Sequence, residues 1–104
     1  MNSVNISGNL THDPELKQFE NTCVVNVNVA INNLRKTEDG ELVNNPAFVA
    51  MEAWDSSAEY IAKRFKKGDL IIATCVMLPY QVDGKQRIKF RMTSFEGPYV
   101  KRKE

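Results

Sequence analysis

A two-residue alternation of apolar and polar side chains runs through most of this chain. It is clearest over residues 23–31, where valines at every second position are separated by asparagines. Residues 4–10 repeat it, with Val4 and Ile6 on one face and serines and asparagines on the other. A period of two places neighbouring side chains on opposite faces of a β-strand, so both segments predict half-buried strands. Gly8, inside the first of them, predicts a bulge or a bend.

Three further strands are predicted over residues 47–54, 69–78 and 85–95. The segment 69–78 is apolar on both faces, which predicts a central strand of the sheet or a subunit contact. Asp39-Gly40 and residues 79–84 carry turn-forming residues and predict two hairpin turns.

One helix is predicted between the third and the fourth strand. Its apolar face is formed by residues at helical spacing: Ala58, Ile61, Ala62 and Phe65. Asp55 or Ser56 is predicted to cap its start, and Gly68 to take the left-handed position after its end. Three strands, one helix and two strands is the order of the OB fold. The sequence therefore predicts an all-β, five-stranded Greek-key barrel of OB type, with the helix between strands 3 and 4.

A chain of 104 residues suffices for one domain with one core. We expect the OB domain to span residues 1–97 and a short basic tail to span 98–104. No segment approaches the roughly 20 apolar residues that cross a bilayer, and a strand pattern begins at once without a leader peptide. Both features predict a cytoplasmic protein without membrane contact. Cys23 and Cys75 lie in apolar segments without CxxC spacing, which predicts buried thiols rather than a disulfide or a metal site.

Motifs for catalysis or cofactor binding are missing from the sequence. The only histidine, His12, lies in a turn-like segment, and the chain has neither a phosphate-binding loop nor a dinucleotide fingerprint. The carboxylates form no recognisable acid–base pair. We therefore expect a protein that is not an enzyme and that holds no cofactor and no metal.

Charge is segregated along the chain although the net charge is only +1. Acidic residues predominate over residues 38–59, and basic residues over 63–67, 85–91 and 101–103. A dedicated nucleic-acid-binding protein is often more basic than this chain. Local basic zones nevertheless attract a polyanion, so nucleic-acid binding stays open on charge alone.

Aromatic side chains on the third predicted strand are candidates for stacking on bases. Phe48 and Trp54 share a face with Glu52, opposite an apolar face, so both rings are expected on the open side as stacking platforms or as a protein interface. Glu52 would repel phosphate there, unless it contacts a base edge or pairs with a neighbouring lysine. Tyr80 in the second hairpin and Phe19 in the first loop are weaker candidates, because either ring can simply pack in a turn.

Cations occupy every second position of the fifth predicted strand: Lys85, Arg87, Lys89 and Arg91. The opposite face, with Ile88, Phe90 and Met92, is predicted to anchor this row on the core. An ordinary solvated strand face is the alternative. Arg35 and Lys36, after the second strand, are further candidates for phosphate contacts. A basic groove combined with exposed aromatics is what proteins use to hold single-stranded nucleic acid.

Several segments together resemble the family of bacterial and phage single-stranded DNA-binding proteins. The opening residues 1–17, with Gly-Asn-Leu followed by Asp-Pro-Glu-Leu-Lys, resemble the family's first strand and turn. Residues 27–31 resemble its second strand, and residues 48–54, followed by Ala58-Glu59 and 65–68, resemble its third strand and helix. The similarity covers about residues 1–96.

The resemblance implies specific roles for residues of this chain. Phe48 and Trp54 take the family's stacking positions, and Lys17, Lys66 and Lys67 its backbone contacts. It also implies a homo-oligomer, usually a tetramer, built through the first strand, which places Asn2, Val4 and Ile6 at the interface.

This chain departs from the family pattern in three places. Leu34-Arg35 stands where the family usually has a tryptophan, and Ser56 replaces a common lysine. The long tail with an acidic tip is absent, so recruitment of repair proteins by such a tail is not expected. These departures predict weaker or shorter-site binding, and they suit a phage, plasmid or mobile-element protein in a bacterial host or a second copy in a bacterium.

The function expected is sequence-independent binding and protection of single-stranded DNA in replication, repair or recombination. Two alternatives remain open at this point. One is an OB-fold replication accessory, similar to the primosomal protein of replication restart, acting mainly through protein contacts. The other is an RNA-binding OB domain, because stacking does not distinguish the sugars unless the 2′-hydroxyl is read.

Overall fold

Residues 1–99, which the computed structural model describes, form eight strands and one helix. In chain order these are β1 (Val4–Leu10), β2 (Leu16–Gln18), β3 (Cys23–Ile31), β4 (Leu34–Lys36), β5 (Leu42–Asn44), β6 (Ala47–Trp54), α1 (Asp55–Arg64), β7 (Leu70–Val82) and β8 (Lys85–Tyr99). The five predicted strands are β1, β3, β6, β7 and β8, and the helix lies between the third and fourth of them. The predicted all-β OB class is thereby confirmed.

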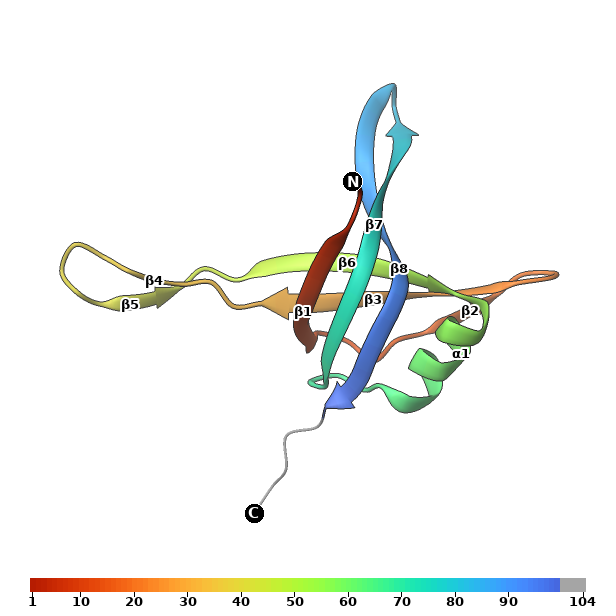
Figure 1. Ribbon diagram of the computed structural model, residues 1–104, viewed down its shortest axis with the longest axis horizontal. Helices are drawn as coiled ribbons and strands as arrows, with labels where there is room; N and C mark the ends of the chain where they lie inside the picture. The colour runs from red at the N-terminus through yellow and green to blue at the C-terminus, as the bar shows by residue number, and fades with distance from the viewer. Residues whose placement is uncertain (100–104) are drawn as a thin grey trace, which may run out of the picture.

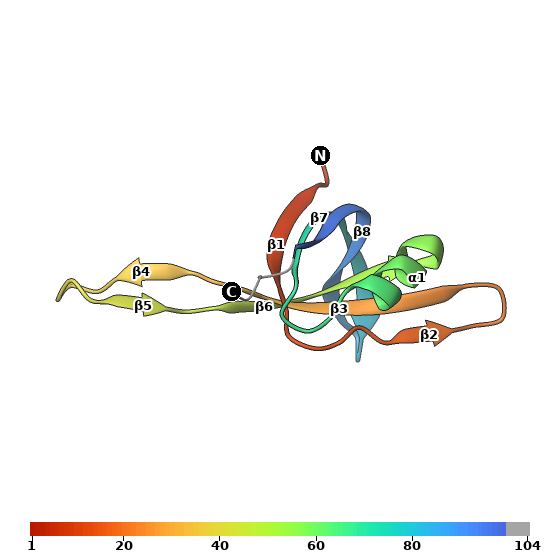
Figure 2. The same ribbon diagram turned by 90° about the horizontal axis from the view of Figure 1, so that it is seen from below.

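Five strands form a ring of pairings. The hydrogen-bonded order runs β1-β7-β8-β6-β3, and β1 also pairs with β3 at Asn9 and Leu10. The pairing of β6 with β8 is parallel, with Glu52 opposite Arg91, whereas the other strand pairs are antiparallel. Figures 1 and 2 show β1, β7 and β8 crossing the long β3–β6 layer, with α1 beside one end of that layer.

The core lies inside this ring and is built from one face of each strand. Its largest side chains with almost no solvent exposure are Phe65, Met51, Ile61, Ile71 and three valines of β3. Cys23 and Cys75 are free and buried, as their apolar surroundings predicted. The central position predicted for the fourth strand is confirmed, because β7 lies between β1 and β8.

Gly8 lies close against the backbone of β3. A Cβ atom at this position would lie 2.8 Å from the carbonyl oxygen of Ala30 and 3.1 Å from the Cβ of Val29. The reason for glycine is therefore the close approach of two strands, at the point where β1 turns from β7 towards β3.

Gly8→Ala is expected to reduce the free energy of unfolding by about 1–3 kcal/mol, because β3 must move to admit the methyl group. Chemical denaturation measures this loss. Ser7→Ala, at the exposed neighbouring position, is the matched control. Equal stability of the two variants would contradict the close-approach interpretation.

The predicted cap of the helix is wrong. The N-cap position is Trp54, and no side chain donates or accepts a capping hydrogen bond there, so neither Asp55 nor Ser56 caps the helix. Asp55 instead has a positive φ of 54°, and its carboxylate accepts hydrogen bonds from the Thr22 hydroxyl and the Cys23 N–H. The carboxylate therefore ties the start of α1 to the start of β3.

Two hairpins extend well beyond the ring. The β4–β5 hairpin continues the β3–β6 layer to one side, and the ends of β7 and β8 form a second arm (Figure 1). The radius of gyration is 15.7 Å, compared with about 13 Å for a compact domain of this length. Within residues 1–99, no helix is long and apolar enough to cross a membrane.

The predicted boundary between domain and tail is displaced. β8 continues through Pro98 to Tyr99, and Tyr99 pairs with Leu70. Residues 98 and 99 thus belong to the sheet rather than to a tail. The rest of the predicted basic tail, residues 100–104, lies outside the described residues.

Candidate nucleic-acid interface

The outer face of β3 and β6 is polar and carries an aromatic ring near each end. The antiparallel register places Asn26 opposite Glu52, Ala30 opposite Phe48, and Val24 opposite Trp54. Alternate residues of both strands point into the core, so this outer row is what remains for solvent. At 3.3 Å per residue, the two rings sit about 20 Å apart along β6.

A groove crosses this face and is formed by two adjoining hollows. One hollow, of about 390 Å³, is lined by residues of β3, β6, β7 and β8, including Glu52, Tyr80 and Lys89. The other, of about 310 Å³, is lined by His12, Lys17 and other residues near β2. Asn26 and Asn28 line both hollows. We call this continuous surface the groove.

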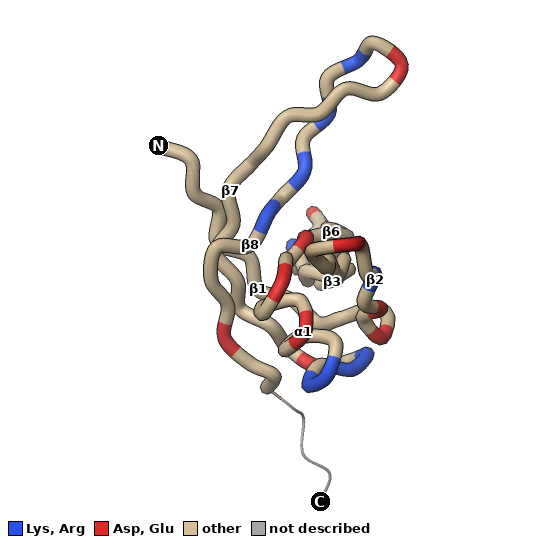
Figure 3. The backbone as a smooth tube through the Cα atoms, turned by 90° about the vertical axis from the view of Figure 1, so that its right-hand side faces the viewer, with Lys and Arg blue, Asp and Glu red and all other residues tan. Residues whose placement is uncertain are grey.

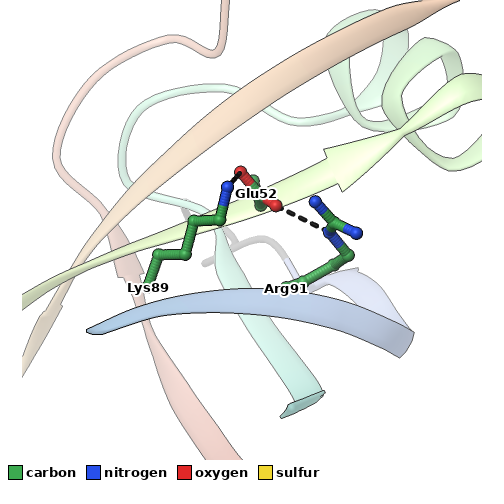
Figure 4. Close-up of polar contacts among 3 residues, drawn as sticks. All are labelled: Glu52, Lys89 and Arg91. Carbon is green, nitrogen blue, oxygen red and sulfur yellow. Dashed lines mark hydrogen bonds and ion pairs between the residues drawn. The ribbon is translucent and has the colours of Figure 1, made fainter. Parts of the chain in front are cut away.

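Glu52 forms ion pairs with two cations of β8 inside the groove. Its Oε1 accepts a hydrogen bond from Nε of Arg91 at 2.6 Å, and its Oε2 lies 3.7 Å from Nζ of Lys89 (Figure 4). Burial works against ionisation of this carboxyl, but the hydrogen bond and the two positive charges outweigh it and lower the pKa of Glu52. Of the roles that the sequence left open for Glu52, pairing with a lysine is the one that the structure shows, and an arginine joins that pair.

The row of four cations on β8 is divided by this pairing. Lys89 and Arg91 are half-buried and bound to Glu52, whereas Lys85 and Arg87 are exposed along the β7–β8 arm (Figure 3). The predicted anchor is also only partly right. Phe90 and Met92 pack against the core, but Ile88 is 54% exposed, because β8 has left the ring at that point.

The two rings of β6 differ in accessibility. Phe48 is 71% exposed. Trp54 is half-buried, and the guanidinium carbon of Arg91 lies 5.4 Å from the centre of its ring, within range of a cation–π contact. Phe48 is therefore an open platform, while one face of Trp54 is covered.

Tyr80 and Phe19 lie in different surroundings. Tyr80 is 41% exposed and lines the groove beside Lys89. Phe19 is exposed in the loop after β2, beside a hollow that also contains the carboxylates of Glu20, Asp55 and Glu59. The structure brings Tyr80 to the groove and places Phe19 in an acidic region outside it.

Lys17 lies at the β2 end of the groove together with the carboxylates of Asp13 and Glu15, and Lys67 contacts that end through its backbone. Lys17 lines the hollow there. The backbone N–H of Lys67 donates to Oδ1 of Asp13 at 2.7 Å, and Asp13 lines the same hollow. Gly68 has the expected positive φ of 95°, but it lies in this turn beyond Phe65, the C-cap residue, rather than directly after the helix.

Arg35 and Lys36 are exposed on β4 and lie on the β4–β5 arm, outside the groove. Neighbouring residues of a strand point to opposite faces, so a single DNA path along the arm would meet only one of them directly.

The side chains of the predicted oligomer interface are engaged within the chain. Ile6 is buried in the core and Val4 packs against it. Asn2 donates through Nδ2 to the carbonyl oxygen of Met77 at 2.9 Å and accepts from the Met77 N–H at 2.8 Å. The placement of Asn2, Val4 and Ile6 at an oligomer interface stays a prediction, and within one chain the alternation of β1 turns the side chains of Val4 and Ile6 inward.

Asn26 and Asn28 are the groove residues that sequence reasoning missed. In the sequence they form only the polar half of the alternation over residues 23–31. The feature that could have identified them is the amide side chain, which both donates and accepts hydrogen bonds and can therefore contact the edge of a base.

A five-stranded ring with a helix between its third and fourth strands defines an OB-fold protein, and OB folds take oligonucleotides or oligosaccharides on the face formed by their second and third strands. The groove crosses that face, on β3 and β6. The chain belongs to the single-strand binding protein family, because the model of that family matches residues 1–93. This is a family of binding proteins rather than enzymes.

Relatives of known sequence agree with this assignment. The chain is 33% identical over 75 residues to the single-stranded DNA-binding protein 1 of Clostridium acetobutylicum, covering 68% of this chain and 64% of that protein. It is 36% identical over 70 residues to the single-stranded DNA-binding protein of Thermus aquaticus, covering 66% of this chain and 25% of that protein. The chain thus spans less than two thirds of these relatives.

The crystal structure of the wild-type Thermus aquaticus single-stranded DNA-binding protein has the same fold. It superimposes with a TM-score of 0.79 at 20% identity, covering 92% of this chain and 49% of that one.

Proposed function

We propose that this protein binds and protects single-stranded DNA without regard to sequence, in replication, repair or recombination. The observation that carries the proposal is the groove across β3 and β6, with Lys17 lining one of its hollows, Lys89 lining the other, and the open ring of Phe48 on the same outer face. We further propose that the protein is not an enzyme and that it acts in the cytoplasm of a bacterium, or of the bacterial host of a phage.

Bases are proposed to stack on aromatic residues of the groove and of the β3–β6 face that it crosses, while cations hold the phosphates. Phe48, Trp54 and Tyr80 supply the rings. Stacking on such rings tolerates any base, because every base has a π-face. The phosphates are held by exposed cations at the two ends, namely Lys17, Lys66, Lys67, Lys85 and Arg87. Asn26 and Asn28 lie between these ends, where bases would pass.

Self-association is proposed as part of this function, with a tetramer favoured. Two features of the described residues support it. Residues 4–8 of β1 pair with β7 on one edge only, and an open strand edge offers unpaired backbone groups to a second chain. The neighbouring strand β7 exposes Ile72 and Met77. The backbone edge of β1, rather than its apolar side chains, would then make the contact.

Neither alternative is favoured over this proposal. An accessory protein acting through protein contacts does not require aromatic rings and asparagines along one groove. The relatives that match this chain are named for single-stranded DNA. A preference for RNA would need a contact to the 2′-hydroxyl, so oligo-rU belongs in the experiment beside oligo-dT.

Titration with oligo-dT is expected to change the fluorescence of Trp54, the only tryptophan of the chain, because the ring lies at the end of the β3–β6 face. The logarithm of the affinity is expected to fall with the logarithm of the salt concentration, by about 0.7 for each phosphate neutralised. Duplex DNA of the same length is the control. Equal affinity for duplex and single strand, without a fluorescence change, would overturn the proposed function.

A further inference from the structure

Glu52 is the one charged residue of β6, and it lies in the middle of the face proposed to carry DNA. Its two oxygens bind Arg91 and Lys89, the cations of β8 that lie beside β6 in the ring. The Glu52 side chain is only 12% exposed, so this pair is better shielded from solvent than an ordinary surface ion pair. The parallel pairing of β6 and β8, which sets Glu52 opposite Arg91, holds it in place.

A carboxylate and a phosphate compete for the same guanidinium. Both present oxygens that match the planar donors of arginine, so an arginine already bound to one has fewer donors for the other. Lys89 and Arg91 are therefore not free phosphate-binding groups in the unbound protein. Arg91 also lies over Trp54 while Glu52 holds it.

We propose that Glu52 is a built-in competitor of the DNA phosphates. This inference rests on the proposed function and adds to it. A DNA strand entering the groove displaces Glu52 from Arg91 and Lys89, and the movement of Arg91 uncovers the face of Trp54 for a base. The exchange makes binding weaker and less dependent on salt than the number of cations on β8 would suggest. It also makes the strand easier to release.

Glu52→Gln tests the proposal because it keeps the shape and the acceptor oxygen but removes the charge. The variant is expected to bind oligo-dT about five- to tenfold more tightly at moderate salt, since each tenfold step corresponds to 1.4 kcal/mol of competition removed. The salt slope is expected to steepen by about 1.4, because two freed cations each neutralise a phosphate at about 0.7.

Glu96→Gln is the matched control. Glu96 is an exposed residue of β8 paired with Ile72, outside the groove, and its replacement changes the net charge by the same amount. Any gain from net charge alone is shared by both variants. The proposal is overturned if Glu52→Gln binds no more tightly than Glu96→Gln, or more weakly than the parent protein.

A second readout needs no DNA and therefore separates this inference from the proposed function. The pKa of Glu52 is lowered. The pH must therefore fall below the range in which glutamate ordinarily titrates, about 4.3, before the carboxylate is protonated and releases Arg91. The charged and titratable groups that face Glu52 are Lys89 and Arg91 on β8 and Tyr80 on β7, whereas β3 contributes the uncharged amides of Asn26 and Asn28 to the same hollow.

The fluorescence of Trp54 in the free protein is expected to change in one acidic step that Glu52→Gln lacks and Glu96→Gln retains. Circular dichroism at the same pH values confirms that the fold persists. A step of equal size in Glu52→Gln would overturn the link between Glu52, Arg91 and Trp54. If the step behaves as expected but neither protein binds oligo-dT, the proposed function fails, together with the competition inferred from it, and only this link survives.

Discussion

Phe48→Ala is expected to weaken binding of oligo-dT by about 1–3 kcal/mol, which is from roughly fivefold to more than a hundredfold in affinity. Phe48 presents the most open ring on the proposed DNA face, with 71% of its surface exposed. A base stacked on that ring loses its whole platform when the side chain is cut back to a methyl group. Trp54 is a poorer first target, because its replacement would also disturb Arg91.

Fluorescence anisotropy of a labelled oligo-dT measures this loss. The melting temperature of Phe48→Ala is expected to stay close to that of the parent, since an exposed ring contributes little to the core. Phe19→Ala serves as the matched control, because Phe19 is also an exposed phenylalanine but lies among carboxylates outside the groove. The assignment of Phe48 as the main platform is wrong if both variants lose the same affinity.

The sequence predicted the ring of strands well because its main signal is local. The alternation in β3 and β6 assigns each residue to a face, and that assignment placed Phe48, Glu52 and Trp54 together on the outer side. The same logic identified the buried cysteines and the apolar face of α1. These features depend only on residues that are close in the chain.

The contacts that modify the groove depend on residues that are far apart in the chain. Glu52 and Arg91 are 39 positions apart and meet only because β6 and β8 pair in parallel. The sequence left open whether Glu52 pairs with a lysine, and it did not indicate which two cations of β8 are paired. Asp55 was assigned to the helix cap for the same reason, because its real partner, Thr22, lies 33 positions earlier. Strand order can be inferred from a pattern, but the register between distant strands cannot.

The low net charge of the chain is compatible with the proposed binding of DNA because of how the charges are distributed. A net charge of +1 is low for a polyanion-binding protein. The exposed cations proposed to hold phosphates are Lys17, Lys66 and Lys67 on one side and Lys85 and Arg87 on the β7–β8 arm. In the middle of the groove, Glu52 offsets one of the two positive charges of Lys89 and Arg91. Such a distribution favours holding a strand at its two ends, while the rings and amides between them take the bases.

Phe65→Ala is expected to be the most destabilising of these substitutions, by about 3–5 kcal/mol, because a large buried ring is replaced by a methyl group and leaves a cavity. Phe65 is only 2% exposed and lies edge-on against Phe95, with 5.9 Å between the ring centres. It also lies so close to Gly97 that a Cβ there would come within 3.0 Å of its ring. The ring thus joins the end of α1 to the end of β8.

At about 4–8 °C per kcal/mol for a domain of roughly this size, the melting temperature of Phe65→Ala is expected to fall by at least about 12 °C. Phe65→Leu keeps most of the buried volume and should lose clearly less, whereas the exposed Phe19→Ala should melt like the parent. Below its melting temperature Phe65→Ala is expected to retain its affinity for oligo-dT, because Phe65 does not line the groove. A variant that melts like the parent would show that α1 is not held on the ring by this side chain. A folded variant that no longer binds would show that the end of α1 shapes the groove as well as the core.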